Sequence, residues 1–115
     1  MNLITAYGAI ESKGSIKKIQ INRRDTTEND IEIDILYCGI CHSDIHQVNN
    51  DWGGSQYPII PGHEIVGKIL SIGSKVNKFK VGDLVGVGCL VDSCHTCSSC
   101  NDDLEQYCEA GFTGT

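Results

Sequence analysis

Four cysteines near the end of the chain are spaced like the ligands of a zinc ion. Cys94, Cys97, Cys100 and Cys108 lie within fifteen residues, in the pattern C-x2-C-x2-C-x7-C. A C-x2-C turn brings two sulfur atoms to one ion, and zinc binds four sulfurs tetrahedrally at about 2.3 Å. We therefore predict a structural zinc site in the loop of residues 94–108. Because four thiolates complete the coordination sphere, this site would stabilise the fold and leave no position for substrate.

Two other interpretations of this loop stay open. The pattern C-x2-C-x2-C also begins the cluster motif of bacterial ferredoxins, but the long final spacing and the lack of a proline after Cys108 disfavour an iron–sulfur cluster. A knot of disulfides is the third interpretation. His95 lies inside the loop, and we interpret it as a bystander because four sulfurs already complete a site. The acidic neighbours are predicted to form a solvated face: Asp92, Asp102, Asp103, Glu105 and Glu109.

A cysteine and a histidine about twenty residues apart form a second candidate group. Cys41 precedes Ser43 and His46, and His63 is followed by Glu64. Taken alone, Cys41 and His63 are also explained as a buried cysteine and a hydrogen-bonded histidine. Serine and histidine are, however, residue types that pass a proton stepwise to solvent. Glu64 is a further candidate to lie beside a metal, so the group indicates a catalytic metal site with a proton relay.

These motifs resemble those of the zinc-dependent, medium-chain alcohol dehydrogenases. The zinc signature G-H-E-x2-G-x5-G-x2-V is present at residues 62–76 with every fixed position intact. The C-H-S-D segment at residues 41–44 and the four-cysteine loop appear in the expected order, and the resemblance covers residues 3–115. Residues 37–44 and 81–88 are most similar to the cinnamyl-alcohol-dehydrogenase group, which includes NADP-dependent, broad-specificity aldehyde reductases.

The resemblance implies a role for each residue of the second group. Cys41 and His63 would be ligands of a catalytic zinc, with Glu64 at or behind that zinc. Ser43 would accept the proton of the alcohol, and His46 would relay it outward by way of cofactor hydroxyls. Such a zinc keeps one coordination position open and acts as a Lewis acid on the alcohol or carbonyl oxygen.

Cofactor and substrate contacts follow from the same resemblance. His42 would approach the cofactor pyrophosphate, and Trp52 would wall the substrate pocket. Cys38 and Cys89 match no ligand position of the family, and we predict that both are small buried residues. The implied reaction is hydride transfer between NADP(H), or NAD(H), and a primary alcohol or aldehyde.

The elements that must position these residues are predicted to be short strands. Residues 31–35 alternate between isoleucine and acidic residues, which is the period of a half-buried strand. Residues 3–7, 16–21, 65–72 and 84–91 are further strand candidates, and residues 43–48 favour a short helix with Ser43 as its N-cap. Glycines 67, 73, 82, 86 and 88 predict bulges and close backbone approaches. The pattern predicts a small, mostly β barrel, which the resemblance identifies as a partly open GroES-like β-barrel.

Composition excludes several classes of protein. A net charge of −6 disfavours a nucleic-acid surface, which is normally basic. No run approaches the roughly 18 apolar residues of a membrane-spanning helix. The first residues, Met1 to Ile4, lack the basic start and apolar core of a signal peptide, so we expect a cytoplasmic protein. With nucleic acid and membrane disfavoured, the expected partner is a small molecule, the alcohol or aldehyde that the resemblance implies.

Length indicates that other parts of the enzyme lie outside these residues. The 115 residues allow one domain, at roughly 100–200 residues per domain. No G-x-G-x-x-G followed by a helix is present, so no dinucleotide-binding unit is visible. We expect residues 1–115 to be the incomplete N-terminal GroES-like catalytic domain, truncated before the Rossmann domain and before the third catalytic-zinc ligand. Alone it would be inactive, and the complete protein would be a homodimer or tetramer.

Two alternatives to an enzyme are considered. A zinc-stabilised β module without catalysis would bind one zinc ion per chain instead of two. A zinc ribbon that binds nucleic acid is weaker, because the acidic loop would repel phosphate.

Overall fold

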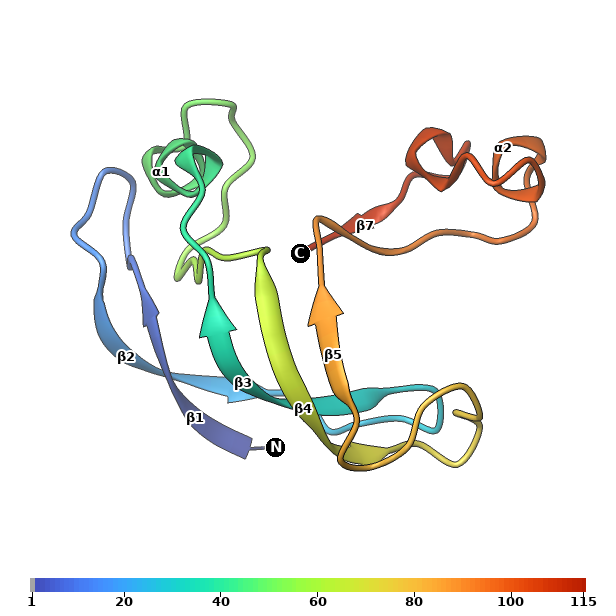
Figure 1. The fold of residues 1–115 in the computed structure, drawn as a ribbon. Coiled ribbons are helices and arrows are strands. Elements are labelled where there is room, and N and C mark those ends of the chain that lie inside the picture. Colours follow the sequence, from blue (N-terminus) through green and yellow to red (C-terminus); the bar gives the residue numbers. More distant parts are fainter. Residues whose placement is uncertain (1) are drawn as a thin grey trace.

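The computed structural model describes residues 2–115, which fold mostly into short antiparallel strands (Figure 1). β1 pairs with β2, and β6 pairs with β7. Between these two pairs, a three-stranded sheet has the strand order β3-β4-β5. None of the helices in the described residues is long and apolar enough to cross a membrane. The elements are β1 (Asn2–Gly8), β2 (Lys17–Arg23), β3 (Ile31–Cys38), α1 (His42–Asn49), β4 (Ile65–Ile72), β5 (Leu84–Val87), β6 (Leu90–Asp92), α2 (Ser98–Asn101), the 3-10 helix η1 (Glu105–Tyr107) and β7 (Thr113–Gly114).

The strand prediction is confirmed for β1 to β4 and wrong for the apolar run 84–91. That run divides between β5 and β6, which belong to different sheets. The division has a backbone cause. The N–H of Thr115 donates to the carbonyl of Cys89 at 3.2 Å, and the Thr115 hydroxyl donates to the carbonyl of Gly88. These bonds and the pairing of β6 with β7 draw the chain out of the three-stranded sheet.

Glycine allows two close approaches that shape the central sheet. A Cβ at Gly67 of β4 would collide with the side chain of Ile33 on β3, and one at Gly73 would collide with the backbone of Glu28. At both positions the predicted close approach is confirmed, because only a residue without a side chain fits. Gly88 differs, since nothing lies within 4 Å of a Cβ built there.

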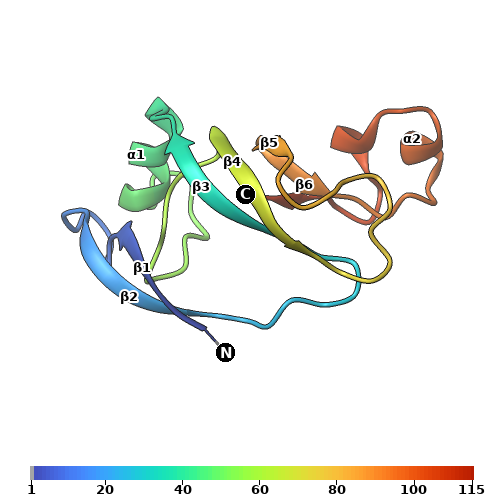
Figure 2. The same ribbon diagram turned by 60° about the horizontal axis from the view of Figure 1, so that its bottom comes forward.

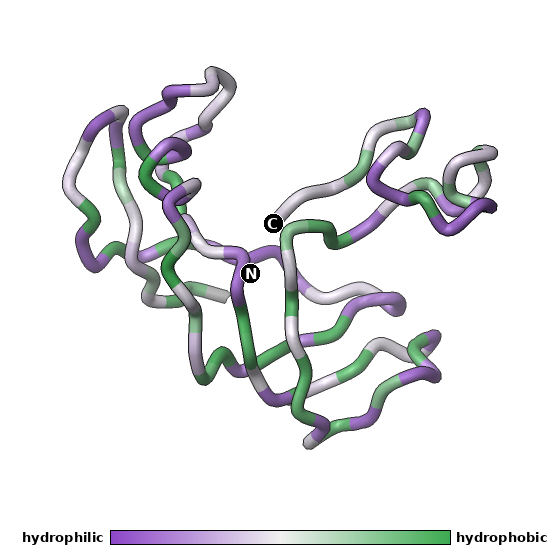
Figure 3. Tube along the Cα trace, turned by 45° about the horizontal axis from the view of Figure 1, so that its top comes forward, coloured by the Kyte–Doolittle hydropathy of each residue, from purple (hydrophilic) through white to green (hydrophobic). Residues whose placement is uncertain are grey.

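The apolar core of the described residues is small. Its buried members are Ala9, Val48, Ile69, Cys100 and Cys108. Among the residues whose side chains the structure describes, Ile69, at 1% exposure, is the one large side chain that is fully buried. The apolar strands of the central sheet and the mixed C-terminal loop are visible in Figure 3. A domain of this size gains little stability from such a core, so a bound metal would contribute strongly to its folding.

The two regions that carry the candidate ligands lie at opposite sides of the molecule. α1 lies beside the β1–β2 hairpin, whereas α2 and η1 extend beyond β5 and β6, in both Figure 1 and Figure 2. The molecule measures 39 × 32 × 24 Å along its principal axes. The described chain therefore presents two separate candidate metal sites.

Candidate functional site

Cys41 is held in place by the first turn of α1. The N-cap of this helix is Cys41 and not Ser43 as predicted. The reason is the carboxylate of Asp44, which accepts the backbone N–H of Cys41 at 3.0 Å, while the N–H of Asp44 donates to the Cys41 carbonyl at 3.1 Å. This arrangement satisfies N–H groups that a helix start otherwise leaves unpaired. The Ser43 hydroxyl is left to donate to the Cys41 sulfur at 3.2 Å.

Three ligand-type side chains converge at this helix start. The ligand atoms of Cys41, His63 and Glu64 all lie within 4.8 Å of one another, although Cys41 and His63 come from separate segments. Asp44, which is buried, lies 3.4 Å from Nδ1 of His63 through Oδ1. A carboxylate at one ring nitrogen orients a metal-binding histidine and leaves the other nitrogen for the metal. Asp44 thus connects Cys41 to His63.

Two glycines allow the segments to meet so closely. Gly62 has φ +137°, and a Cβ on it would lie 2.6 Å from the sulfur of Cys38. A Cβ on Gly39 would collide with the carboxylate of Glu64, and the Gly39 N–H donates to the Glu64 carbonyl at 2.9 Å. Gly39, before Cys41, therefore leaves room for the side chain of Glu64, and Gly62, before His63, leaves room for the side chain of Cys38. This interlocking explains why glycines 39 and 62 accompany the ligand-type residues.

The electrostatics of the site favour the Cys41 thiolate, the form in which a cysteine binds a metal. The Ser43 hydroxyl, then the Ser43 backbone N–H and then His63 lower the pKa of the Cys41 thiol. The hydrogen bond with Cys41 raises the pKa of His63, to which Asp44 and Glu64 also contribute, whereas burial opposes the shift. A thiolate, an imidazole and a carboxylate within reach of one point are zinc ligand types. The residues present fit a zinc ion.

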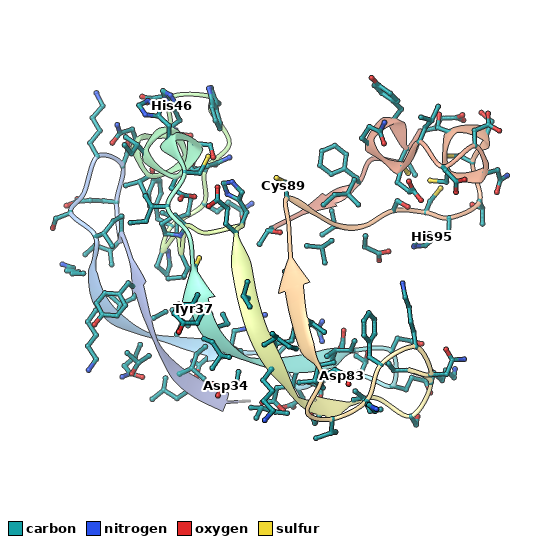
Figure 4. All side chains as sticks on the ribbon, in the orientation of Figure 1. Asp34, Tyr37, His46, Asp83, Cys89 and His95 are labelled. Atoms are coloured by element: carbon teal, nitrogen blue, oxygen red, sulfur yellow. The ribbon has the colours of Figure 1, made fainter. Side chains whose placement is uncertain are left out.

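A cavity of about 320 Å³ adjoins this group. Its lining includes Ser43, Trp52, His63 and Cys89. Cys89 is exposed, and so is Cys38, so the prediction that both are buried was wrong. Cys38 ends β3, whose last residues are exposed on both faces of the strand. Cys89 lies beyond the end of β5, toward the space between α1 and the C-terminal loop (Figure 4).

His46 is packed between two aromatic rings and a carboxylate. Its ring centroid lies 4.9 Å from that of His42 and 4.9 Å from that of Trp52. Its Nδ1 lies 2.9 Å from Oδ2 of Asp51, whose backbone N–H donates to the His46 carbonyl at 3.0 Å. Among the side-chain hydrogen bonds of residues 2–115, none joins Ser43 to His46. The predicted relay residues thus share a helix without a direct hydrogen bond between their side chains.

Asp44 and Asp51 were missed by the sequence analysis. Asp44 carries a recognisable signal, because it lies three residues after Cys41, where a capping carboxylate is expected. Asp51 carries none, since it reaches His46 only because the chain turns back after Asn50, which adopts a left-handed conformation at φ 58°.

The four cysteines of the C-terminal loop also converge. Their sulfur atoms all lie within 4.8 Å of one another, and those of Cys94 and Cys100 are 3.9 Å apart. A tetrahedron with zinc–sulfur bonds of about 2.3 Å has edges of about 3.8 Å. The spacing is therefore that of four ligands around a single ion. His95 is not part of this group, because its Nε2 pairs with Oδ1 of exposed Asp92 at 2.9 Å (Figure 4).

The two facing sulfurs of this loop differ in acidity. The backbone N–H of Thr96, the Thr96 hydroxyl and the N–H of Cys97 lower the pKa of Cys94 to about 6. The Ser93 hydroxyl acts to lower the pKa of Cys100, but burial and the neighbouring thiols raise it to about 11. Hydrogen bonds from N–H and hydroxyl donors therefore favour the thiolate that a metal requires, most clearly at Cys94.

Comparison with known proteins agrees with the fold. The alcohol dehydrogenase GroES-like domain family matches residues 27–115. The chain is 52% identical over 112 residues to the aldehyde reductase YahK of Escherichia coli K12, covering 97% of this chain and 32% of that protein. It is 55% identical over 107 residues to cinnamyl alcohol dehydrogenase 2 of Rauvolfia serpentina, covering 91% and 30%.

Solved structures of cinnamyl alcohol dehydrogenases have the same fold. The enzyme from Sorghum bicolor superposes with a TM-score of 0.91 at 41% identity, over 99% of this chain and 32% of that one. The enzyme from Helicobacter pylori, complexed with NADP(H), gives 0.90 at 43% identity, over 96% and 32%. The chain thus spans about a third of the length of these relatives. With its mostly β fold and its G-H-E signature, the chain belongs to the alcohol dehydrogenase GroES-like domain family.

Proposed function

We propose that the protein is a zinc-dependent alcohol dehydrogenase or aldehyde reductase that transfers hydride between NADP(H) and a primary alcohol or aldehyde. The observation that carries this proposal is the convergence of Cys41, His63 and Glu64 beside a cavity of about 320 Å³. The similarity to an aldehyde reductase and to cinnamyl alcohol dehydrogenases supports the substrate class. The NADP(H) complex of the Helicobacter pylori relative supports NADP over NAD.

Each residue of the site has a proposed role in holding the metal. Cys41 and His63 are ligands of the catalytic zinc, and Glu64 lies at or behind it. Asp44 is a positioning residue, because it contacts both the Cys41 backbone and the His63 ring. When bound, the zinc supplies a Lewis acid for the substrate oxygen. The third ligand and the dinucleotide-binding domain belong, in this proposal, to a part of the protein outside these 115 residues.

The proton path runs along α1. Ser43 lines the cavity and holds the alcohol proton at Oγ, and His46 passes a proton outward from its imidazole. A bridging hydroxyl group or water must connect them, since their side chains make no hydrogen bond with each other in the described chain. Asp51 holds Nδ1 of His46, and the Trp52 ring packs against the same imidazole. Trp52 also walls the cavity, and His42 faces the cofactor pyrophosphate.

The remaining proposals concern the loop and the assembly. Cys94, Cys97, Cys100 and Cys108 bind a structural zinc. The complete protein is a cytoplasmic homodimer or tetramer that acts on small molecules. Nucleic acid is not expected as a partner, because the net charge is −6.

Metal content combined with turnover tests the proposal. The complete protein, including its dinucleotide-binding domain, is purified, analysed for zinc and assayed for NADPH oxidation with short aliphatic and aromatic aldehydes. We expect two zinc ions per polypeptide and turnover with at least one aldehyde class. One zinc ion per polypeptide with no oxidation of NADPH by any aldehyde would instead identify a non-catalytic, zinc-stabilised β module.

A further inference from the structure

We infer that the hydroxyl groups of Ser93 and Thr96 act on the four-cysteine loop as donors to its sulfur atoms, and that they set how tightly and how long the loop holds its metal. The inference rests on the proposed structural zinc. It concerns two residues that no ligand motif includes, and it assigns them a positioning role toward the metal.

Backbone N–H groups donate to the sulfurs of Cys94, Cys97 and Cys108 with good geometry, and the N–H of His95 also acts to lower the pKa of Cys100. The sulfur of Cys94 accepts from the N–H groups of Thr96 and Cys97 at 3.5 and 3.3 Å. The sulfur of Cys97 accepts from Cys100 and Glu109, both at 3.5 Å. The sulfur of Cys108 accepts from the N–H of Cys94 at 3.4 Å. These donors belong to the main chain, so side-chain substitution does not remove them.

Two side-chain hydroxyls add to this set at the two sulfurs that face each other. The Thr96 hydroxyl donates to the sulfur of Cys94 at 3.6 Å, and the Ser93 hydroxyl oxygen lies 3.4 Å from the sulfur of Cys100. In residues 2–115 no other hydroxyl is hydrogen-bonded to a sulfur of the loop. The Cys94 and Cys100 sulfurs are 3.9 Å apart, so two thiolates there repel each other unless their charge is compensated.

Metal binding decides which group donates in the hydrogen bond between Ser93 and Cys100. A free Cys100 thiol can donate its hydrogen to the Ser93 oxygen. A metal-bound sulfur has lost that hydrogen, so the hydroxyl must then be the donor. Cys100 is only 8% exposed, so water contributes little to its solvation. The contact therefore becomes a hydrogen bond to a charged acceptor, which is stronger than a neutral one.

The sequence around the loop makes these donors more important. A zinc ion with four thiolates carries a net charge of −2, yet residues 81–115 contain no lysine or arginine and six acidic residues. The only histidine among them, His95, is already paired with Asp92. No cationic side chain of this segment offsets the charge, so hydrogen-bond donors must do so. Partners in the second coordination shell typically change metal affinity by about 10- to 100-fold.

Cobalt substitution tests the inference in the full chain, in a Cys41→Ser background that removes the thiolate of the other site. Ser93→Ala, Thr96→Val and the double variant are loaded with Co²⁺. Thr96→Ser keeps the hydroxyl, and Ser98→Ala removes a loop hydroxyl that donates to the Glu109 carboxylate and not to sulfur. The two readouts are the rate at which a chelator removes Co²⁺ and the energy of the thiolate-to-cobalt charge-transfer absorption. Circular dichroism checks that each variant is folded.

We expect the double variant to lose Co²⁺ about ten times faster than the parent. Its charge-transfer absorption should move to lower energy, because a sulfur with fewer donors gives up electron density more readily. Each single variant should show part of both changes, whereas Thr96→Ser and Ser98→Ala should behave as the parent. A folded double variant with the parent's release rate and absorption would overturn the inference. A parent whose loop takes up no Co²⁺ would overturn the structural-zinc proposal as well, so the two failures are distinguishable.

Discussion

The four-cysteine loop and the Cys41–His63 site reach similar convergence by opposite routes. The loop takes all its candidate ligands from fifteen consecutive residues, and main-chain N–H groups of the same segment surround their sulfurs. The Cys41–His63 site joins a helix start to the residues before β4, and it depends on glycines 39 and 62 for the close approach. The loop is thus built locally, whereas the second site exists only once the sheet has formed.

The two sites also differ in whether their own ligands complete a coordination sphere. The loop offers four sulfurs, which suffice for zinc, and two of its cysteines are among the few buried apolar residues of the chain. The Cys41–His63 site offers fewer ligand atoms and adjoins a cavity, which suits a metal that must also bind substrate. In the proposed function, the first arrangement serves stability and the second serves chemistry, and the predictions below test that division.

The largest effect is expected from Cys100→Ser. This change removes a buried candidate ligand, and a structural zinc contributes on the order of 10 kcal/mol to the folding of small zinc domains. We expect the zinc content to fall by one ion per polypeptide and thermal stability to fall sharply. Zinc analysis and calorimetry measure both. Full zinc content in the variant would show that the loop does not depend on this sulfur.

His63→Ala should separate activity from stability. Loss of a Lewis acid worth several kcal/mol corresponds to about a 10³-fold loss of turnover. We expect that loss together with one retained zinc ion, which is the ion of the loop. NADPH oxidation and zinc analysis are the measurements. If the remaining ion were lost as well, the two sites would not be independent.

Asp51→Asn should give a smaller loss, because it leaves both metal sites intact. The amide still reaches Nδ1 of His46 but lacks the negative charge of the carboxylate that holds the ring. General acid–base catalysis is typically worth about 10²- to 10⁴-fold, so we expect roughly a tenfold fall in kcat with an unchanged zinc content. Asp34→Asn, on the exposed side of β3, is the matched control. Equal kcat values for the two variants would argue against the role of Asp51.

The same contrast explains what could be predicted from the sequence. Local patterns were sufficient for β1 to β4, because the composition and alternation of residues within a segment indicate a strand whatever its partner. They were also sufficient for the spacing of the cysteine loop, because its members are close in sequence. Prediction failed where several groups compete for the same backbone partner, whether they are near or far along the chain. Asp44 takes the capping role and leaves Ser43 to Cys41, and Thr115 bonds to the Gly88 carbonyl and divides the strand predicted for residues 84–91.

Exposure was equally hard to predict. Cys38 and Cys89 are small apolar residue types, which normally favour burial. Both are exposed because one ends a strand that is open on two faces and the other follows the last strand of the central sheet. Their environment is set by which strands pair, and single residues do not encode that pairing.

The smallest effect is expected from Ser98→Ala. The Ser98 hydroxyl donates to the Glu109 carboxylate at 2.7 Å and connects α2 to the returning end of the loop. This bond is exposed, so water replaces it at little cost, and we expect a loss below about 1 kcal/mol with unchanged zinc content. Glu109 keeps its place because its backbone N–H still donates to the sulfur of Cys97. Denaturant unfolding of the zinc-loaded protein measures the change. A loss comparable to that of Cys100→Ser would mean that polar cross-links, and not the metal, hold the loop together, and the contrast between the two sites would then have a different physical basis.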